Sequence, residues 1–171
     1  STVRKASMRR ADASPRLPIG VAARMITAPF SPGPVPRAGP GPDKYDGRVR
    51  QRDEFEAIVK GWIATARHPT LDRPYTSAIY APMVELLAYL RANGFETWIV
   101  SGGGIDFMRP WVEGAYGIPP QQVIGSQIAE SYQVIDGKPQ MVRESGIFFV
   151  DDGPGKPVGI HRHIGKRPVL A

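Results

Sequence analysis

The segment TWIVSGGGIDFMRPW, residues 97–111, decides the fold of this chain. An apolar run ends at Ser101, three glycines follow, and a segment with helical spacing of apolar residues begins directly after them. This order predicts a buried strand, a glycine turn and a helix over residues 105–117. Such a turn favours an anion site, because unhindered backbone N–H groups meet the positive end of the helix dipole. The alternative is a glycine turn that only lets the helix pack closely on the strand.

Helices and strands alternate from residue 53 onward. Helical patterns with suitable ends cover, besides 105–117, residues 53–68, 81–94 and 155–165. Strand patterns cover residues 121–128, 146–152 and 167–171, and residues 131–142 form a hairpin pattern around Asp136-Gly137. This alternation predicts a three-layer α/β fold with a mainly parallel sheet and helices on both faces.

The first 50 residues differ from the rest in composition. Residues 1–52 hold 11 Lys and Arg against 3 Asp and Glu, a net charge of +8, whereas residues 53–171 hold 11 against 13, a net charge of −2. The Pro/Gly-rich run 28–42 cannot sustain a helix or a sheet ladder. We therefore expect residues 1–50 to be a disordered tail, which is either simply solvated or binds nucleic acid or another partner through its charge.

Composition excludes several classes of protein. The chain has no cysteine, so it has no disulfide framework, no thiolate zinc site and no cysteine nucleophile. No apolar run reaches membrane-spanning length, and the basic N-terminal stretch lacks the apolar region of a secretory signal. These features predict a cytoplasmic protein with no membrane partner.

Lys156, in the segment DGPGKPVG, residues 152–159, is a basic residue that could complement an anion at the glycine turn. It begins a later helix and can reach the same edge of the sheet as the glycine turn, where a cation would complement a bound phosphate. A solvated lysine in a Gly/Pro loop is the alternative. Asp151 and Asp152, just before it, favour either a capped, solvated loop or a substitute metal site.

Other polar residues give weaker signals. Side chains two residues apart on a helix diverge by about 200°, so His161 and His163 favour surface positions over a shared metal ion. Asp106, directly after the glycines, suits a helix N-terminus, although its charge would repel a phosphate.

Residues 80–128 and 155–171 together resemble phosphatases of the haloacid dehalogenase superfamily, in its phosphoserine-phosphatase-like branch. The resemblance implies a Rossmann-like core. It also implies that Ser101, Gly102 and Gly103 bind the transferring phosphoryl group and that Lys156 is the catalytic lysine that steadies the nucleophile and the phosphoryl charge.

The resemblance extends over about residues 53–171 and implies a division of the chain. Residues 51–80 would be the remnant of a helical cap, and residues 81–171 would be a partial α/β core. The expected substrate is a small phosphorylated molecule, and the expected cofactor is Mg²⁺.

Two motifs of this superfamily have no counterpart here. There is no Asp-x-Asp-x-Thr segment, since Asp43 and Asp46 flank two residues in a Gly/Pro context, and an acidic metal-binding motif would follow Ala171, the last residue. We therefore expect a truncated, incomplete phosphatase that is inactive as this chain. The first strand of the superfamily's sheet would be missing, so we expect either a marginally stable monomer or a homo-oligomer that covers the exposed edge. The alternative is a non-catalytic anion-binding or interaction protein.

Overall fold

The computed structural model describes residues 50–171. Its helices are α1 (Arg52–Thr65), α2 (Ala81–Ala92), α3 (Ile105–Tyr116) and α4 (Gly155–Ile164), with short 3₁₀ helices η1 (Tyr75–Ser77) and η2 (Pro120–Gln122). Its strands are β1 (Arg50–Gln51), β2 (Ile99–Gly104), β3 (Val123–Ile135) and β4 (Lys138–Phe149). The predicted disordered tail thus lies outside the described residues, except for Arg50. Within them, no helix is both long and apolar enough to cross a lipid bilayer.

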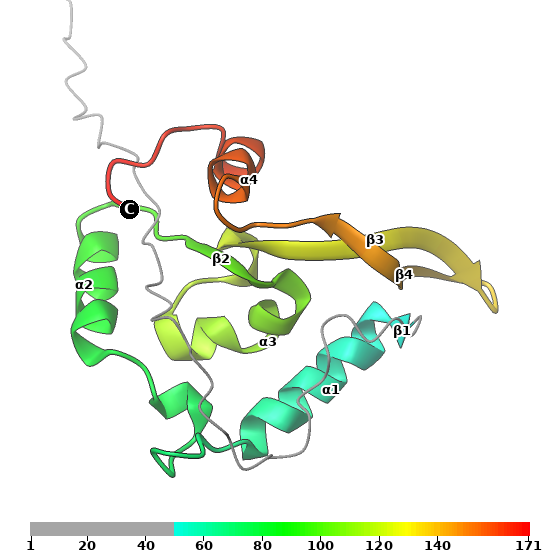
Figure 1. Cartoon of the computed structure of the whole chain (residues 1–171), viewed down its shortest axis with the longest axis horizontal. Helices are drawn as coiled ribbons and strands as arrows, with labels where there is room; N and C mark the ends of the chain where they lie inside the picture. Colours follow the sequence, from blue (N-terminus) through cyan, green and yellow to red (C-terminus); the bar gives the residue numbers. More distant parts are fainter. Residues whose placement is uncertain (1–49) are drawn as a thin grey trace, which may run out of the picture.

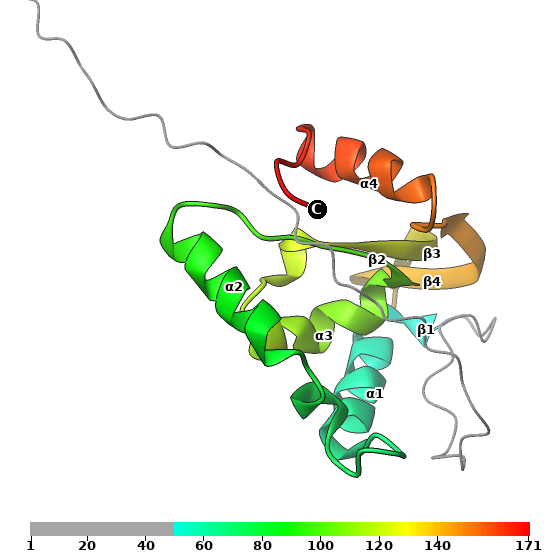
Figure 2. The ribbon, with the colours of Figure 1, turned by 60° about the vertical axis from the view of Figure 1, so that its left-hand side comes forward.

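The strands form one sheet in the order β1-β4-β3-β2, with α4 on one face and α1 and α3 on the other (Figures 1 and 2). This three-layer arrangement confirms the predicted α/β, Rossmann-like class. The sheet is mixed rather than mainly parallel: β2 and β3 are parallel, but β4 is antiparallel to both β3 and β1. The difference arises because β3 continues directly into a hairpin instead of crossing over through a helix.

Side chains of β2 and β3 alternate between two apolar layers, as the pleat of a strand requires. Ile99 and Val123 pack on the α3 side with Met108 and Val112, while Val100 and Ile124 form a separate cluster on the opposite side. Partly buried residues close this second cluster from α4 and from the segment before β2: Phe95, Trp98, Ile160 and Ile164. Both faces of the parallel pair are therefore buried, as predicted from its apolar run.

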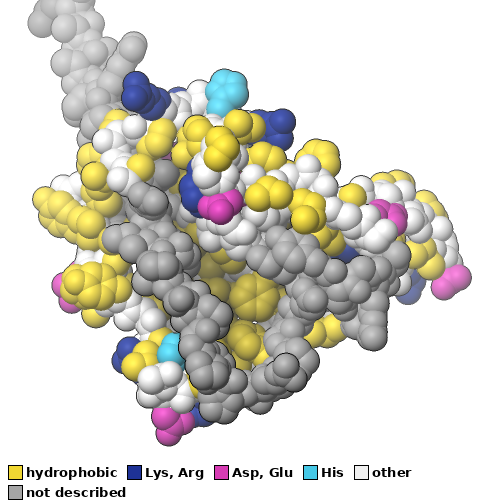
Figure 3. All heavy atoms as spheres, viewed as in Figure 1, with side chains coloured by type: hydrophobic (Ala, Val, Ile, Leu, Met, Phe, Trp, Pro, Cys, Tyr) yellow, Lys and Arg dark blue, Asp and Glu magenta, His cyan; other side chains and the backbone are white. Residues whose placement is uncertain are grey.

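The hairpin between β3 and β4 turns at Asp136 and Gly137, as predicted. Both residues have positive φ, 52° and 75°, which is the backbone of a two-residue type I′ turn. The strands are longer than predicted and form an arm that extends beyond the helices (Figure 1). Hydrophobic side chains are exposed on this arm, as the space-filling view shows (Figure 3). The exposed hydrophobic residues of its two strands are Tyr132, Val134, Met141, Ile147 and Phe148.

The predicted helix ends are confirmed at two glycines. Gly117 and Gly165 have left-handed conformations, with φ of 64° and 69°, at the ends of α3 and α4. The predicted strand at residues 167–171 is wrong: this segment is irregular, and its Val169 and Leu170 are exposed. A strand needs a neighbour to pair with, and this segment forms no ladder with any described strand.

Helix α1 packs on α3 through Phe55, Val59 and Ile63, the buried stripe of its amphipathic pattern. Trp62 extends this contact by lying against the rings of Tyr75 and Phe107. The division of the chain into a tail, a cap remnant over residues 51–80 and a core over 81–171 stays a prediction. So does the homo-oligomer, although β2 is the last strand at one side of the described sheet.

Candidate functional site

The predicted glycine turn is a bulge at the carboxyl end of β2. Ser101 lies opposite Gly125 and Gly104 lies opposite Ser126, so β2 advances three residues where β3 advances one. Gly102 and Gly103, which we call the glycine bulge, are therefore displaced from the regular ladder directly before α3 begins. The bulge brings backbone polar groups to the N-terminus of a helix, which is a favourable place for an anion.

Ser101 is buried at the start of the glycine bulge. Its Oγ accepts a hydrogen bond from the backbone N–H of Gly103 at 3.1 Å. A hydroxyl has one donor and two lone pairs, so this bond leaves the O–H of Ser101 free to donate to an anion. In this structure the N–H of Gly103 thus orients the serine, and the predicted role of Gly103 in binding phosphate stays a prediction.

Lys156, in the first turn of α4, reaches the end of β2. Its Nζ donates to the carbonyl oxygen of Val100 at 3.4 Å and to that of Asp151 at 3.2 Å. Val100 directly precedes Ser101, so the structure brings together the two residues that the sequence singled out for phosphoryl binding. Among residues 50–171, no carboxylate lies at ion-pair distance from this ammonium group, so it can interact with a bound anion.

The carboxyl group of Asp151 lies beneath this site and is fully buried. Neither of its oxygens has a hydrogen-bond partner among the described residues, and a Cβ on Gly159 of α4 would come within 2.6 Å of Oδ1. Burial raises the pKa of Asp151 to about 6, against the opposing effects of the Lys156 ammonium and the nearby backbone N–H of Ser101. That N–H is close to the carboxyl but does not reach hydrogen-bond geometry.

Two residues of β3 that the sequence analysis did not single out hold the bulge in place. The buried hydroxyl of Ser126 donates to the carbonyl oxygen of Gly102 at 2.9 Å and accepts from the backbone N–H of Asp151 at 3.0 Å. A Cβ on Gly125 would lie 2.7 Å from the carbonyl oxygen of Gly103, so only glycine fits there. The signal that could have found them is a Gly-Ser pair inside an otherwise apolar strand.

Asp106 does not face the anion site. Its carboxylate lies 3.7 Å from Nε of Arg143, and both side chains are largely buried. The guanidinium of Arg143 also stacks on the ring of Phe55, 3.5 Å from its centroid. Arg143 therefore offsets the negative charge that would otherwise repel an anion at the start of α3.

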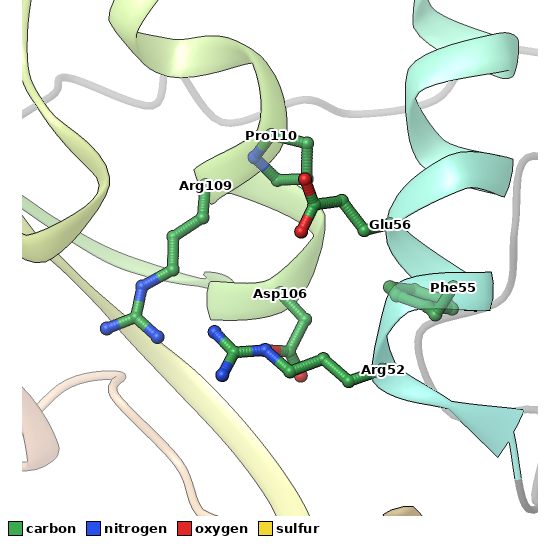
Figure 4. A pocket seen from close by; sticks show the side chains of 6 residues that line it. All are labelled: Arg52, Phe55, Glu56, Asp106, Arg109 and Pro110. Carbon is green, nitrogen blue, oxygen red and sulfur yellow. The ribbon is translucent and has the colours of Figure 1, made fainter. Parts of the chain in front are cut away.

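A small polar cavity lies beside this pair, between α1 and α3 (Figure 4). Its volume of about 10 Å³ is enough for one water molecule. Its lining consists of Arg52, Phe55, Glu56, Asp106, Arg109 and Pro110. Burial lowers the pKa of Arg109, whose Nε donates to the carbonyl oxygen of Pro120 at 3.0 Å. These interactions tie α1 and η2 to α3 and leave no room for a substrate.

The described residues do not form a magnesium site. Among residues 50–171, no three acidic or histidine side chains converge as metal ligands would. The Asp151 carboxyl is turned toward Gly159, whereas the exposed Asp152 lies against Gly102, whose Cβ would be 3.4 Å from that of Asp152. Within residues 50–171, the two carboxyl groups therefore do not converge on one metal position, and His161 and His163 are both exposed on α4, as predicted.

Comparison with known proteins identifies the family to which the chain belongs. A sequence model of haloacid dehalogenase-like hydrolases matches residues 23–148. The match covers more than half of the chain, and the chain belongs to this family. No curated protein is similar enough to match the chain.

Two solved structures resemble it. A conserved, functionally unknown protein from Anaerococcus prevotii DSM 20548 is 18% identical with a TM-score of 0.52, over 75% of this chain and 38% of that one. A phosphoserine phosphohydrolase-like protein from Francisella tularensis subsp. tularensis SCHU S4 is 14% identical with a TM-score of 0.37, over 70% and 47%. The first likeness supports the fold alone. The chain spans less than half of the length of either structure.

Proposed function

We propose that this chain binds the phosphoryl group of a small phosphorylated molecule at Ser101, the glycine bulge and Lys156. The complete active site would hydrolyse a phosphomonoester, as in the phosphoserine-phosphatase-like branch that the sequence resembles. One observation carries the proposal: the Lys156 ammonium lies at the end of β2, beside a buried serine whose O–H is free to donate.

Each group has a separate role in binding. The hydroxyl of Ser101 donates to one non-bridging phosphoryl oxygen, and the Lys156 ammonium offsets the charge of the others. The N-terminus of α3 adds the positive end of its dipole. Because Ser101 is already held by the N–H of Gly103, little side-chain entropy is lost when the anion binds.

Hydrolysis needs more than these groups. A nucleophilic carboxylate must face the phosphorus atom, and Mg²⁺, when bound, offsets the charge that develops during transfer. Within residues 50–171, two carboxyl groups lie near the site: that of Asp151 is buried without access to a ligand, and that of the exposed Asp152 lies against Gly102 but belongs to no metal-binding cluster. We therefore propose that the isolated chain binds phosphate without turning over a phosphomonoester.

Phosphate binding is tested by titrating ¹⁵N-labelled chain with inorganic phosphate and following amide NMR shifts. We expect the shifts to concentrate at Gly102, Gly103 and Lys156, and binding to weaken strongly in Ser101→Ala and Lys156→Met. The control is Lys138→Met, which removes an exposed lysine from the hairpin arm. Equal binding by all variants, or shifts spread over the surface, would show that the site does not bind phosphate.

Turnover is tested with p-nitrophenyl phosphate, with and without Mg²⁺. We expect none from the isolated chain. Metal-dependent turnover that disappears in Ser101→Ala would contradict the proposed inactivity and would establish a phosphatase. Phosphate binding without turnover would favour the alternative, a non-catalytic anion-binding protein, for the chain as it stands.

A further inference from the structure

The phosphate site has two halves, the glycine bulge with Ser101 and the loop that carries Lys156. The side chain of Ser126 lies between them and belongs to neither. From the three hydrogen bonds that link them, we propose that Ser126 is a positioning residue, which sets the glycine bulge and the Lys156 loop at a fixed separation. The inference rests on the proposed function, because it concerns how well the same site binds phosphate.

The first step concerns the carbonyl group of Gly102. In a regular ladder, β3 would supply an N–H for a carbonyl that points toward it, but the bulge removes this residue from the register. The hydroxyl of Ser126 donates to this carbonyl oxygen at 2.9 Å. It thereby fixes the Gly102–Gly103 peptide plane, whose N–H holds the hydroxyl of Ser101.

The second step concerns the loop between β4 and α4. The Ser126 oxygen accepts the backbone N–H of Asp151 at 3.0 Å, and the carbonyl of the same residue accepts Nζ of Lys156 at 3.2 Å. A continuous path of hydrogen bonds therefore runs from Gly102 through Ser126 and Asp151 to the ammonium group.

The third step concerns the loss of the Ser126 hydroxyl, which we call the Ser126 bridge because it bonds to both segments. Ser126 is 97% buried, so water cannot easily replace its hydroxyl. Without the hydroxyl, the carbonyl of Gly102 and the N–H of Asp151 would both lose a partner in a buried place, and each would move to find another. The movement would change the distance between Ser101 and Lys156, on which binding of both to one anion depends.

The experiment compares two serines of the same strand. Ser126→Ala removes the bridge, whereas Ser131→Ala removes a hydroxyl that bonds to Glu144 on the hairpin arm. We expect the affinity for inorganic phosphate to fall about tenfold in Ser126→Ala, equivalent to about 1.4 kcal/mol, and to stay unchanged in Ser131→Ala. Ser126→Thr keeps the hydroxyl and should restore most of the affinity.

Amide hydrogen exchange separates positioning from general stability. In the wild-type chain, bound phosphate should slow exchange of the Asp151 N–H more than that of amides on the hairpin arm, because the anion and the bridge stabilise each other beyond the general stabilisation of the folded chain. This measurement needs no variant and applies even if Ser126→Ala does not fold. Unchanged exchange, or wild-type affinity in Ser126→Ala, would overturn the inference alone. Absence of phosphate binding by the wild-type chain would overturn the proposed function itself.

Discussion

The buried carboxyl of Asp151 should make the stability of the folded chain depend on pH. Its pKa is raised from an ordinary value of 3.8 to about 6 in the folded state. Between these two values the folded chain holds a proton that the unfolded chain has released. The contribution of the protonated carboxyl is therefore complete below pH 3.8 and is lost as the pH rises through 6. Replacing Asp151 with Asn should remove this dependence.

The magnitude follows from the pKa difference. A shift of about two units corresponds to about 3 kcal/mol of unfolding free energy, at about 1.4 kcal/mol per unit. Above pH 6, Asp151→Asn should thus be more stable than the wild-type chain by up to about 3 kcal/mol, and the difference should vanish at acidic pH.

Urea unfolding followed by tryptophan fluorescence measures the effect, since Trp98 packs against the Val100–Ile124 cluster. The titration should extend from below pH 3.8 to above pH 6. Asp152→Asn, which alters the exposed neighbouring carboxyl, is the control and should shift the curve only slightly, because Asp152 contributes less than burial to the raised pKa of Asp151. Parallel curves for the wild-type chain and Asp151→Asn would refute the reasoning, because they would mean that the carboxyl is ionised without cost.

Two further substitutions test the packing around the site. Gly125→Ala should lower the free energy of unfolding by about 1–3 kcal/mol, because its Cβ would overlap the bulge. In contrast, Gly61→Ala should raise the free energy of unfolding by up to about 1 kcal/mol, because Gly61 lies within α1 and a Cβ there would contact nothing. Equal effects of the two substitutions in urea unfolding would show that β3 does not approach the bulge closely at Gly125. Arg143→Ala should cost about 3–5 kcal/mol through its buried pair with Asp106. Arg67→Ala, which breaks an exposed pair, should cost less than about 1 kcal/mol, and thermal unfolding that ranks the two the other way would contradict this.

Local signals predicted most of the described fold. The turn at Asp136-Gly137 and the helix ends at Gly117 and Gly165 require positive φ, which glycine adopts at little cost. A single glycine in the sequence is therefore enough to predict each of these positions. The extent of β4 was harder to predict. The sequence predicted a hairpin over residues 131–142 and a separate strand over 146–152, but Gly146, at φ 120°, lets β4 continue as one strand through an irregular register.

The candidate site was predictable only in part. Ser101 and Lys156 each follow from a local pattern at a strand or helix end, and the fold then brings those ends together. The Ser126 bridge and the burial of Asp151 depend on contacts between segments 24 and 25 residues apart. The negative charge of Asp106 on α3 is likewise offset by Arg143 on β4. No periodic pattern in the sequence predicts such a pair between distant elements.

The glycine bulge also has a consequence for the order of folding. The β3–β4 hairpin closes a two-residue turn and can form within microseconds, before distant segments meet. The bulge needs partners 24 residues away on β3, and the lysine that completes it is 56 residues from Val100. Because closure of longer loops costs more chain entropy, the anion site should be among the last parts to assemble. Phosphate should therefore lower the rate constant of unfolding far more than it raises the rate constant of folding, because the site that binds it forms only after the folding transition state.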